Sequence, residues 1–198
     1  MRAIFIRHGE STANIDLPGS TAGLFELTSR GWEQSREVAA ALREPPSLIV
    51  VSPYLRTQQS AQATIERFAQ VTVETWPIHE FTYLSPPHWE GTREADRWPH
   101  VERYWRLAEP DFREGEGAET FTELLGRCEA ALQRLSALSG PAPVYLFSHG
   151  NFMRALRSLV TDPGMSARDR MMGFWDITGF DNGEQLELTW SGGWRLGR

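Results

Sequence analysis

Two histidines that are far apart in the sequence occupy the same local setting. His8 follows the apolar run 3–6 at the start of the chain, and His149 follows the run 144–147 near its end, each just before a glycine. Short continuous apolar runs predict buried strands, and open α/β sheets bind ligands at the carboxyl ends of their strands. If these two strands are neighbours, both imidazoles lie in one crevice, with the guanidinium of Arg7 beside them.

A third basic side chain, Arg56, is expected at the same rim. The run 48–51 predicts another strand, and residues 54–68 predict the helix that follows it, with Arg56 in its first turn. A positive side chain at a helix N-terminus opposes the helix dipole, so we expect a negatively charged group to compensate it there. Together with Arg7 and the two histidines, Arg56 would surround an anion.

The composition narrows the choice of ligand. The chain has a formal net charge of −6, which disfavours nonspecific binding to nucleic acid and to anionic membranes. All 20 basic residues are arginines, so the sequence lacks the lysine of a P-loop, of a Schiff base and of a kinase. We therefore expect a small phosphorylated substrate that is held by arginine and histidine.

Length and cysteine content place the chain in a broad class. Its 198 residues predict a single domain, and the N-terminus shows neither a signal peptide nor a run of membrane-spanning length. The lone cysteine, Cys128, falls in a helical pattern and is expected to be a small buried side chain. A reducing cytoplasm fits this usage.

Elements that must position the site alternate between strand and helix. In the first part of the chain we expect a strand at Arg2–Ile6, a loop from Glu10 to Glu26, a helix capped by Thr28 and ended by Pro45-Pro46, and a strand at Val71–Thr75. Further along, a capping box at Thr120 predicts the start of a helix that runs to about Leu138, and another helix is expected at Phe152–Val160. The last part predicts two strands, at about Asp176–Phe180 and Gln185–Trp190, joined by the turn Asp181-Asn182-Gly183. This order predicts a mostly parallel sheet that is covered on both faces.

The motifs, taken in order, resemble the histidine phosphatase superfamily, which includes cofactor-dependent phosphoglycerate mutases and many phosphatases. They cover almost the whole chain: Arg7-His8-Gly9-Glu10-Ser11 with Asn14, Leu27-Thr28 with Gly31 and Gln34, Ser52-Pro53-Tyr54-Leu55-Arg56-Thr57, Glu80, and Ser148-His149-Gly150. The resemblance implies a phosphoglycerate mutase-like fold, which is a three-layer α/β/α domain over residues 1–198 with a lid insertion at about 81–119.

The resemblance also implies roles for these side chains. His8 would be the nucleophile that becomes phosphohistidine, and Glu80 would be the proton donor. The phosphate pocket and substrate-binding set would comprise Arg7, Asn14, Arg56, His149, Gly150 and Asn151. Two arginines supply bidentate, permanently charged donors, so neither a metal nor a cofactor is expected.

We expect the two histidines to have different roles. His8 must present one neutral nitrogen to phosphorus, which requires its other nitrogen to donate a proton to a fixed acceptor such as a backbone carbonyl. His149, facing the same phosphate, would favour its charged form and act as a further donor.

The proton donor has a second candidate. Trp89-Glu90-Gly91 resembles a tripeptide that related phosphatases carry soon after the acid, and this makes Glu90 the alternative to Glu80. The aromatic residues between Phe81 and Phe112 suggest a lid that packs some of its rings inside and offers others to the substrate.

Other readings stay open at this stage. The favoured reading is a metal-independent phosphatase of the histidine acid type, which hydrolyses phosphomonoesters through a phosphohistidine on His8. Mutase-type phosphoryl transfer is the rival within the family, although the arginine-histidine-tyrosine-glycine motif of the mutases is missing after Glu80. A noncatalytic phospho-ligand binding protein and a metallohydrolase are further alternatives, but no His-x-x-x-His motif supports the latter. The tryptophans and the C-terminal hairpin leave room for a homodimer.

Overall fold

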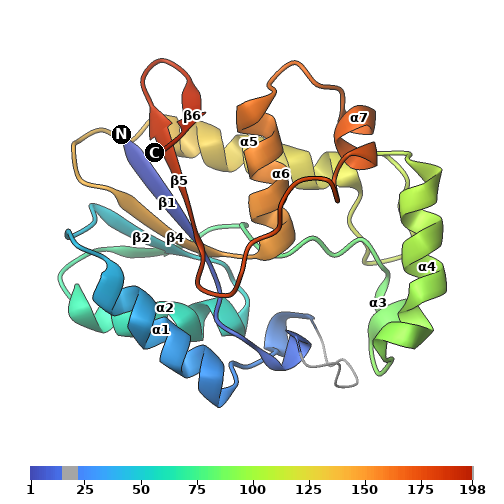
Figure 1. Ribbon diagram of the computed structural model, residues 1–198, viewed down its shortest axis with the longest axis horizontal. Coiled ribbons are helices and arrows are strands. Elements are labelled where there is room, and N and C mark those ends of the chain that lie inside the picture. The colour runs from blue at the N-terminus through green and yellow to red at the C-terminus, as the bar shows by residue number, and fades with distance from the viewer. Residues whose placement is uncertain (15–21, 198) are drawn as a thin grey trace.

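A six-stranded sheet forms the centre of the fold within residues 1–14 and 22–197, which are those that the computed structural model describes (Figure 1). The strands are β1 (Arg2–Arg7), β2 (Leu48–Val51), β3 (Val73–Thr75), β4 (Val144–Ser148), β5 (Gln185–Trp190) and β6 (Trp194–Leu196). Their order in the sheet is β3-β2-β4-β1-β5-β6. Strands β3, β2, β4 and β1 are parallel to one another, β5 is antiparallel to β1, and β6 is antiparallel to β5. The expected mostly parallel α/β sheet is confirmed.

Helices cover both faces of this sheet (Figure 1). One face carries α1 (Ser29–Ala41) and α2 (Leu55–Arg67), and the other carries α5 (Phe121–Ser136) and α6 (Gly150–Thr161). Alternate side chains of β1 enter the two cores: Ile4 and Ile6 pack with α1 and α2, while Ala3 and Phe5 pack with α5 and α6. Burial of apolar side chains on both sides of one strand produces the three layers that the sequence predicts.

Polar caps fix where two of these helices begin. The Thr28 hydroxyl accepts a hydrogen bond from the backbone N–H of Gly31 at 3.1 Å, which starts α1. Thr120 and Glu123 form a reciprocal capping box at the start of α5. Such caps satisfy N–H groups that the first helical turn leaves unpaired, and both agree with the sequence analysis.

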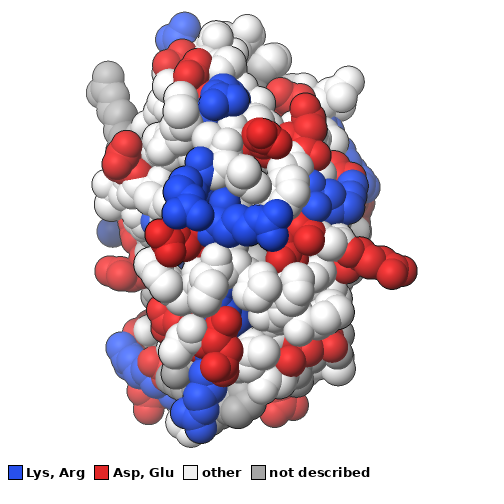
Figure 2. Space-filling model, turned by 90° about the vertical axis from the view of Figure 1, so that its right-hand side faces the viewer, with Lys and Arg blue, Asp and Glu red and all other residues white. Residues whose placement is uncertain are grey.

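The segment 81–119, called the lid segment below, contains two helices that the sequence pattern did not predict. These are α3 (Pro86–Trp89) and α4 (Glu94–Leu107), and α4 includes Pro99. Proline inside a helix removes one intrahelical hydrogen bond, so the sequence pattern of this segment did not indicate a helix. Figure 1 shows both helices beside the sheet layers, and Figure 2 shows acidic and basic side chains mixed over this face of the molecule.

The expected strand at Asp176–Phe180 is wrong. Residues 174–184 follow the short helix α7 (Ala167–Met172) as turns and coil, and the only strand expected there that forms is β5. Both edges of β5 are already paired, with β1 and with β6, so no position next to it remains for another strand. The Asp181-Asn182-Gly183 turn is present, but it leads into β5 from coil.

No helix among the described residues is long and apolar enough to cross a membrane.

Candidate active site

The strand ends bring the predicted histidines together. Strands β1 and β4 pair in parallel with Arg7 opposite Ser148, and the backbone N–H of His8 donates to the Ser148 carbonyl at 3.0 Å. The imidazole of His149 follows on the next residue, and the centroids of the His8 and His149 rings are 5.1 Å apart. The predicted neighbouring strands thus place both buried imidazoles together at their carboxyl ends.

His8 is held in a defined tautomer. Its Nδ1 lies 2.7 Å from the Gly9 carbonyl oxygen, so Nδ1–H donates to the backbone, and Nε2 keeps its lone pair. Burial, followed by the charge of Arg56, holds the pKa of the His8 imidazole well below its usual value. The ring is therefore neutral in ordinary buffers, with Nε2 as its available nucleophilic atom.

Close packing fixes the backbone turn under His8. A Cβ on Gly9 would lie 2.6 Å from the carbonyl oxygen of Gly31, so α1 approaches the turn more closely than a side chain would allow. The Gly9 N–H donates to the Ser60 hydroxyl at 2.9 Å, and the Asn182 amide donates to the His8 carbonyl at 2.9 Å. These contacts come from three separate segments of the chain, and they hold His8 in place.

Arg56 joins the two histidines. Its Nε donates to Nε2 of His8 at 3.1 Å, and one terminal nitrogen donates to Nδ1 of His149 at 3.0 Å. Burial lowers the pKa of Arg56 to about 10, so the guanidinium is still charged at neutral pH. A charged side chain at the first turn of α2 that contacts both imidazoles fits the anion site expected from its position.

His149 is neutral in this arrangement. Because the Arg56 guanidinium can only donate, Nδ1 of His149 accepts, and its Nε2–H donates to the Ser52 hydroxyl at 2.8 Å. Burial, then Arg56, lowers the pKa of His149 well below its usual value. The charged form expected from the sequence concerns a ring that faces a phosphate, and it stays a prediction.

Arg7 completes a group of four residues, called the site floor below: Arg7, His8, Arg56 and His149. One terminal nitrogen of Arg7 donates to the Phe180 carbonyl, while its Nε is buried without a hydrogen-bond partner among the described residues. Gly150 leaves space beside this group, because a Cβ there would lie 3.4 Å from Nε. An unpaired buried donor is costly, so this nitrogen suits an anionic ligand.

Glu80 lies one residue before the lid segment, beside the site floor. Its carboxylate lines the same pocket as Arg56, and Oε1 accepts hydrogen bonds from the backbone N–H groups of Phe81 at 2.9 Å and Asn151 at 3.1 Å. Asn151, expected to bind substrate, thus uses its backbone N–H to hold Glu80. Glu90 is exposed and does not line this pocket, so of the two candidate carboxylates it is Glu80 that lies beside Arg56.

A nearly buried ion pair holds the segment that carries Glu80. Arg127 donates to the carbonyls of Pro77 at 2.7 Å and His79 at 3.1 Å. Glu119 binds the same guanidinium in a bidentate manner, at 2.6 and 2.9 Å. Since bidentate pairs fix geometry as well as charge, this pair orients the chain just before the acid. No local motif signals this contact.

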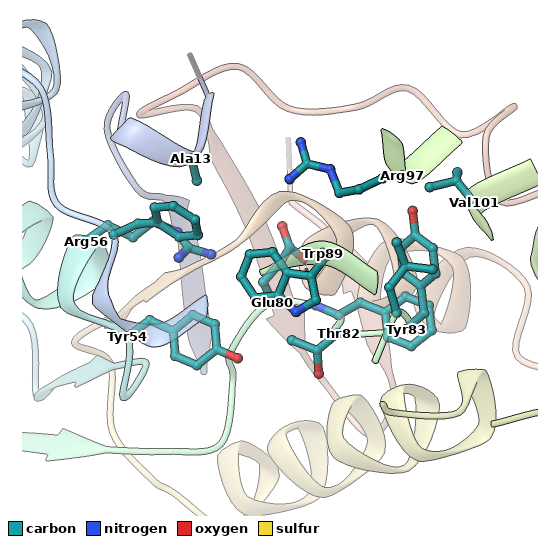
Figure 3. A pocket seen from close by; sticks show the side chains of 12 residues that line it. Ala13, Tyr54, Arg56, Glu80, Thr82, Tyr83, Trp89, Arg97 and Val101 are labelled. Atoms are coloured by element: carbon teal, nitrogen blue, oxygen red, sulfur yellow. Dashed lines mark hydrogen bonds between the residues drawn. The ribbon is translucent and has the colours of Figure 1, made fainter. Parts of the chain in front are cut away.

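The pocket beside the site floor combines an apolar wall with charged groups (Figure 3). Figure 3 shows Tyr54 and Arg56 on one side and Tyr83, Arg97 and Val101 on the other. The full lining comprises Ala13, Phe25, Tyr54, Arg56, Glu80, Phe81, Thr82, Tyr83, Leu84, Trp89, Arg97 and Val101. The lid segment thus buries some aromatic rings, such as that of Tyr104, and presents others to the pocket, as hypothesised.

Asn14 lies outside this lining and is exposed. Its side-chain oxygen accepts hydrogen bonds from the backbone N–H of Ser11 at 3.0 Å and from its hydroxyl at 2.9 Å. The amide nitrogen is therefore the group of Asn14 that a phosphate would use.

Sequence reasoning missed several residues around the site. Arg154 on α6 lies over the Trp175 ring at 4.5 Å and interacts electrostatically with Glu80 and Arg7. Tyr54 packs edge-on against His149, with centroids 5.2 Å apart. Arg154 follows His149 by five residues and so lies one turn into the same helix, which is the signal that could have located it.

A sequence profile settles the family. The profile of the histidine phosphatase superfamily (branch 1) matches residues 3–190. The chain belongs to the histidine phosphatase superfamily. The match spans the strand-end motifs and the lid segment alike, and the family membership expected from the motifs is confirmed.

Solved structures of similar fold support the same architecture. An alpha-ribazole phosphatase from Shigella flexneri is 23% identical, with a TM-score of 0.78 and coverage of 100% of this chain and 95% of that one. A mycobacterial glucosyl-3-phosphoglycerate phosphatase in complex with VO3 is 23% identical, with a TM-score of 0.77 and coverage of 100% and 97%. Among curated proteins, none matches the sequence significantly. At this identity, the likeness establishes the phosphoglycerate mutase-like fold.

Proposed function

We propose that the protein is a phosphatase that hydrolyses a small phosphomonoester through a phosphohistidine on His8. The observation that carries this proposal is the neutral His8 Nε2, which is fixed by its own backbone turn and contacted by Arg56. A nucleophile beside a permanent cation, with a carboxylic acid across the pocket, is what phosphoryl transfer to a side chain requires.

The first half-reaction transfers the phosphoryl group to the protein. Arg7, Arg56 and Asn14 bind the phosphate oxygens, and His8 Nε2 attacks phosphorus in line with the departing oxygen. The P–O ester bond breaks as the N–P bond forms, and Glu80 gives its proton to the leaving alcohol. Oε1 of Glu80 accepts the two shorter backbone hydrogen bonds, and Oε2 accepts only the long one from the Asn151 N–H at 3.4 Å, so Oε2 is the oxygen better placed to carry this proton.

The second half-reaction restores the protein. The Glu80 carboxylate takes a proton from water, the water oxygen attacks phosphorus, and the N–P bond breaks to release phosphate and neutral His8. A bound phosphate dianion favours the protonated form of His149, which reverses the effect of Arg56 on that ring and adds a donor. The reaction is balanced without oxidant, reductant or cofactor.

Arginines supply the charge that a metal ion supplies in other phosphoryl-transfer enzymes, so we propose that turnover is independent of metal. Solved relatives bear the names of an alpha-ribazole phosphatase and a glucosyl-3-phosphoglycerate phosphatase, and the latter has a structure with inorganic phosphate. These names point to phosphomonoesters of sugars and related small molecules as the first substrates to test. We further propose that residues 1–198 act as one catalytic domain in the cytoplasm. A homodimer stays a prediction.

The central test is hydrolysis of p-nitrophenyl phosphate with EDTA present. Wild-type protein should turn over, and His8→Ala should lose at least about 10⁴-fold in kcat, as expected when a nucleophile is removed. Quenching at neutral or alkaline pH, followed by mass spectrometry, should find the phosphoryl group on the peptide that contains His8. Activity that survives His8→Ala would refute the proposal.

A further inference from the structure

A second cluster of potential ligands lies in the lid segment, away from the site floor. His88 on α3, His100 on α4 and Glu114 in the loop after α4 bring one imidazole nitrogen each and a carboxylate oxygen within 4.8 Å of one another. Nδ1 of His88 lies 2.5 Å from Oε1 of Glu114, and Nδ1 of His100 lies 3.3 Å from the same oxygen. Two imidazoles from separate helices thus contact the same carboxylate oxygen, which belongs to a third segment.

The surroundings fix this carboxylate in place. The Glu114 side chain is only 8% exposed, and its Oε2 accepts a hydrogen bond from the Ser85 N–H at 2.8 Å. Gly115 allows this approach, because a Cβ there would lie 2.8 Å from the Ser85 side chain. One oxygen is therefore held by the backbone, and the other is left for the two imidazoles. Support of a ligand's second oxygen in this way is typical of metal sites.

The two imidazoles lie too close together for both to be protonated. The His88 and His100 rings stack with centroids 4.0 Å apart and planes 19° from parallel, so two protonated rings would repel each other at contact. A divalent cation instead accepts the lone pairs of both nitrogens and neutralises the carboxylate. Tetrahedral Zn²⁺ with ligand distances of about 2.0 Å separates its ligand atoms by about 3.3 Å. Small rotations of the two rings would reach that spacing.

The geometry points to a binding site for a divalent transition-metal ion, with Zn²⁺ as the best match, formed by His88, His100 and Glu114. Two imidazoles and a carboxylate suit Zn²⁺, whereas Mg²⁺ and Ca²⁺ prefer oxygen ligands. The site is separate from the proposed reaction: its ion would join α3 to α4. Trp89, Arg97 and Val101 on these helices line the pocket beside Arg56. The ion would thereby fix the wall of that pocket.

The test uses the full chain without an affinity tag, stripped with a chelator and then dialysed. A calorimetric titration with ZnCl₂ should show that one Zn²⁺ ion binds per chain. Added Mg²⁺ should not displace the bound Zn²⁺. His100→Ala and Glu114→Gln should each weaken binding at least tenfold, while Glu116→Gln, an exposed glutamate of the same loop, should bind as the wild type does. Thermal unfolding with and without Zn²⁺ verifies that each variant is folded.

Two further measurements separate this site from the histidines of the site floor. His8→Ala should still bind one Zn²⁺, even though it is expected to be inactive. Co²⁺ in the wild type should give the intense visible absorption of a tetrahedral site, and Glu114→Gln should remove it. Zn²⁺ binding that is absent in the wild type, or unchanged in both His100→Ala and Glu114→Gln, would overturn the proposal.

Discussion

The site floor and the lid segment are built in contrasting ways. The four side chains of the site floor follow strand ends or open a helix, and backbone hydrogen bonds of the sheet set their spacing. The lid segment has no strand, and its position depends on packed aromatic rings such as Phe81 and Tyr104, 6.1 Å apart, and on ion pairs. Main-chain geometry therefore governs where phosphate would bind, while side-chain packing governs what surrounds the rest of a substrate.

This difference predicts that the two regions affect different kinetic parameters, which can be measured separately. Substitutions in the site floor should change the rate of phosphoryl transfer, because those groups would contact the reacting phosphate. Substitutions in the lid segment should change the affinity for substrate and the choice among substrates. Glu80 lies one residue before the lid segment, between the two regions, and its substitution should affect the rate.

The largest effect among these is expected for Arg56→Lys. An ammonium cannot contact His8 and His149 at once, so kcat/KM should fall by roughly 10³-fold, near the upper range for loss of one charge-stabilising donor. Arg67→Lys, near the far end of the same helix, should leave steady-state kinetics within twofold of wild type. Equal kinetics for Arg56→Lys and the wild type would remove Arg56 from the mechanism.

Glu80→Gln should slow turnover in a way that depends on the leaving group. With alkyl phosphates, kcat should fall by about 10²-fold, the lower end of what a general acid contributes, because the departing alkoxide needs a proton. With p-nitrophenyl phosphate the first step needs no acid, so the loss should be smaller. Glu90→Gln is the matched control and should change little. The reverse outcome, a large loss only in Glu90→Gln, would reassign the proton donor.

Trp89→Ala should act on substrate binding. Removing a ring from the pocket wall should raise KM by roughly tenfold, about 1.4 kcal/mol, for substrates that fill the pocket. The value of kcat should stay within threefold. Trp98→Ala, an exposed tryptophan of the same helix-rich segment that does not line this pocket, is the comparison. If Trp89→Ala and the wild type have the same KM for every phosphomonoester in a panel, the lid segment does not select the substrate.

The smallest effect concerns stability and pH. Burial holds the pKa values of His8 and His149 well below their usual range, so the unfolded chain binds more protons than the folded one as pH falls below about 6.5. Each ring should cost roughly 1.4 kcal/mol of unfolding free energy between pH 7.5 and 5.5. Urea denaturation of the wild type and of His8→Ala at both pH values measures this. The variant should lose about half of the combined dependence of the two rings, and equal pH dependence would contradict the depressed pKa of His8.

The site floor could be predicted from the sequence because its information is local. Arg7 ends a short apolar strand, His8 and His149 each follow one, and the α/β pattern places those strand ends together. Short apolar runs predicted the strands β1, β2 and β4, and the spacing of apolar residues together with the helix caps predicted the helices around them. The family resemblance then supplied roles that spacing alone could not.

The lid segment could not be predicted, since its information is long-range. Helix α4 contains Pro99, and the pair Arg127–Glu119, which holds the chain before Glu80, joins two elements that no motif connects. The wrong strand at 176–180 has a similar cause: the Phe180 carbonyl accepts a hydrogen bond from Arg7, so backbone that looked like a strand serves the site. Side-chain demands of this kind are visible only once the fold brings the partners together.

The hydrogen bond from His8 Nδ1 to the Gly9 carbonyl has a consequence for mutational robustness. In many enzymes the acceptor that orients a catalytic histidine is a carboxylate, and a single codon change can remove it. Here the acceptor is a main-chain atom of the adjacent residue, which no side-chain replacement can delete. Only a change of backbone shape can disturb it, and the close approach of Gly9 to Gly31 concentrates that vulnerability at two glycines.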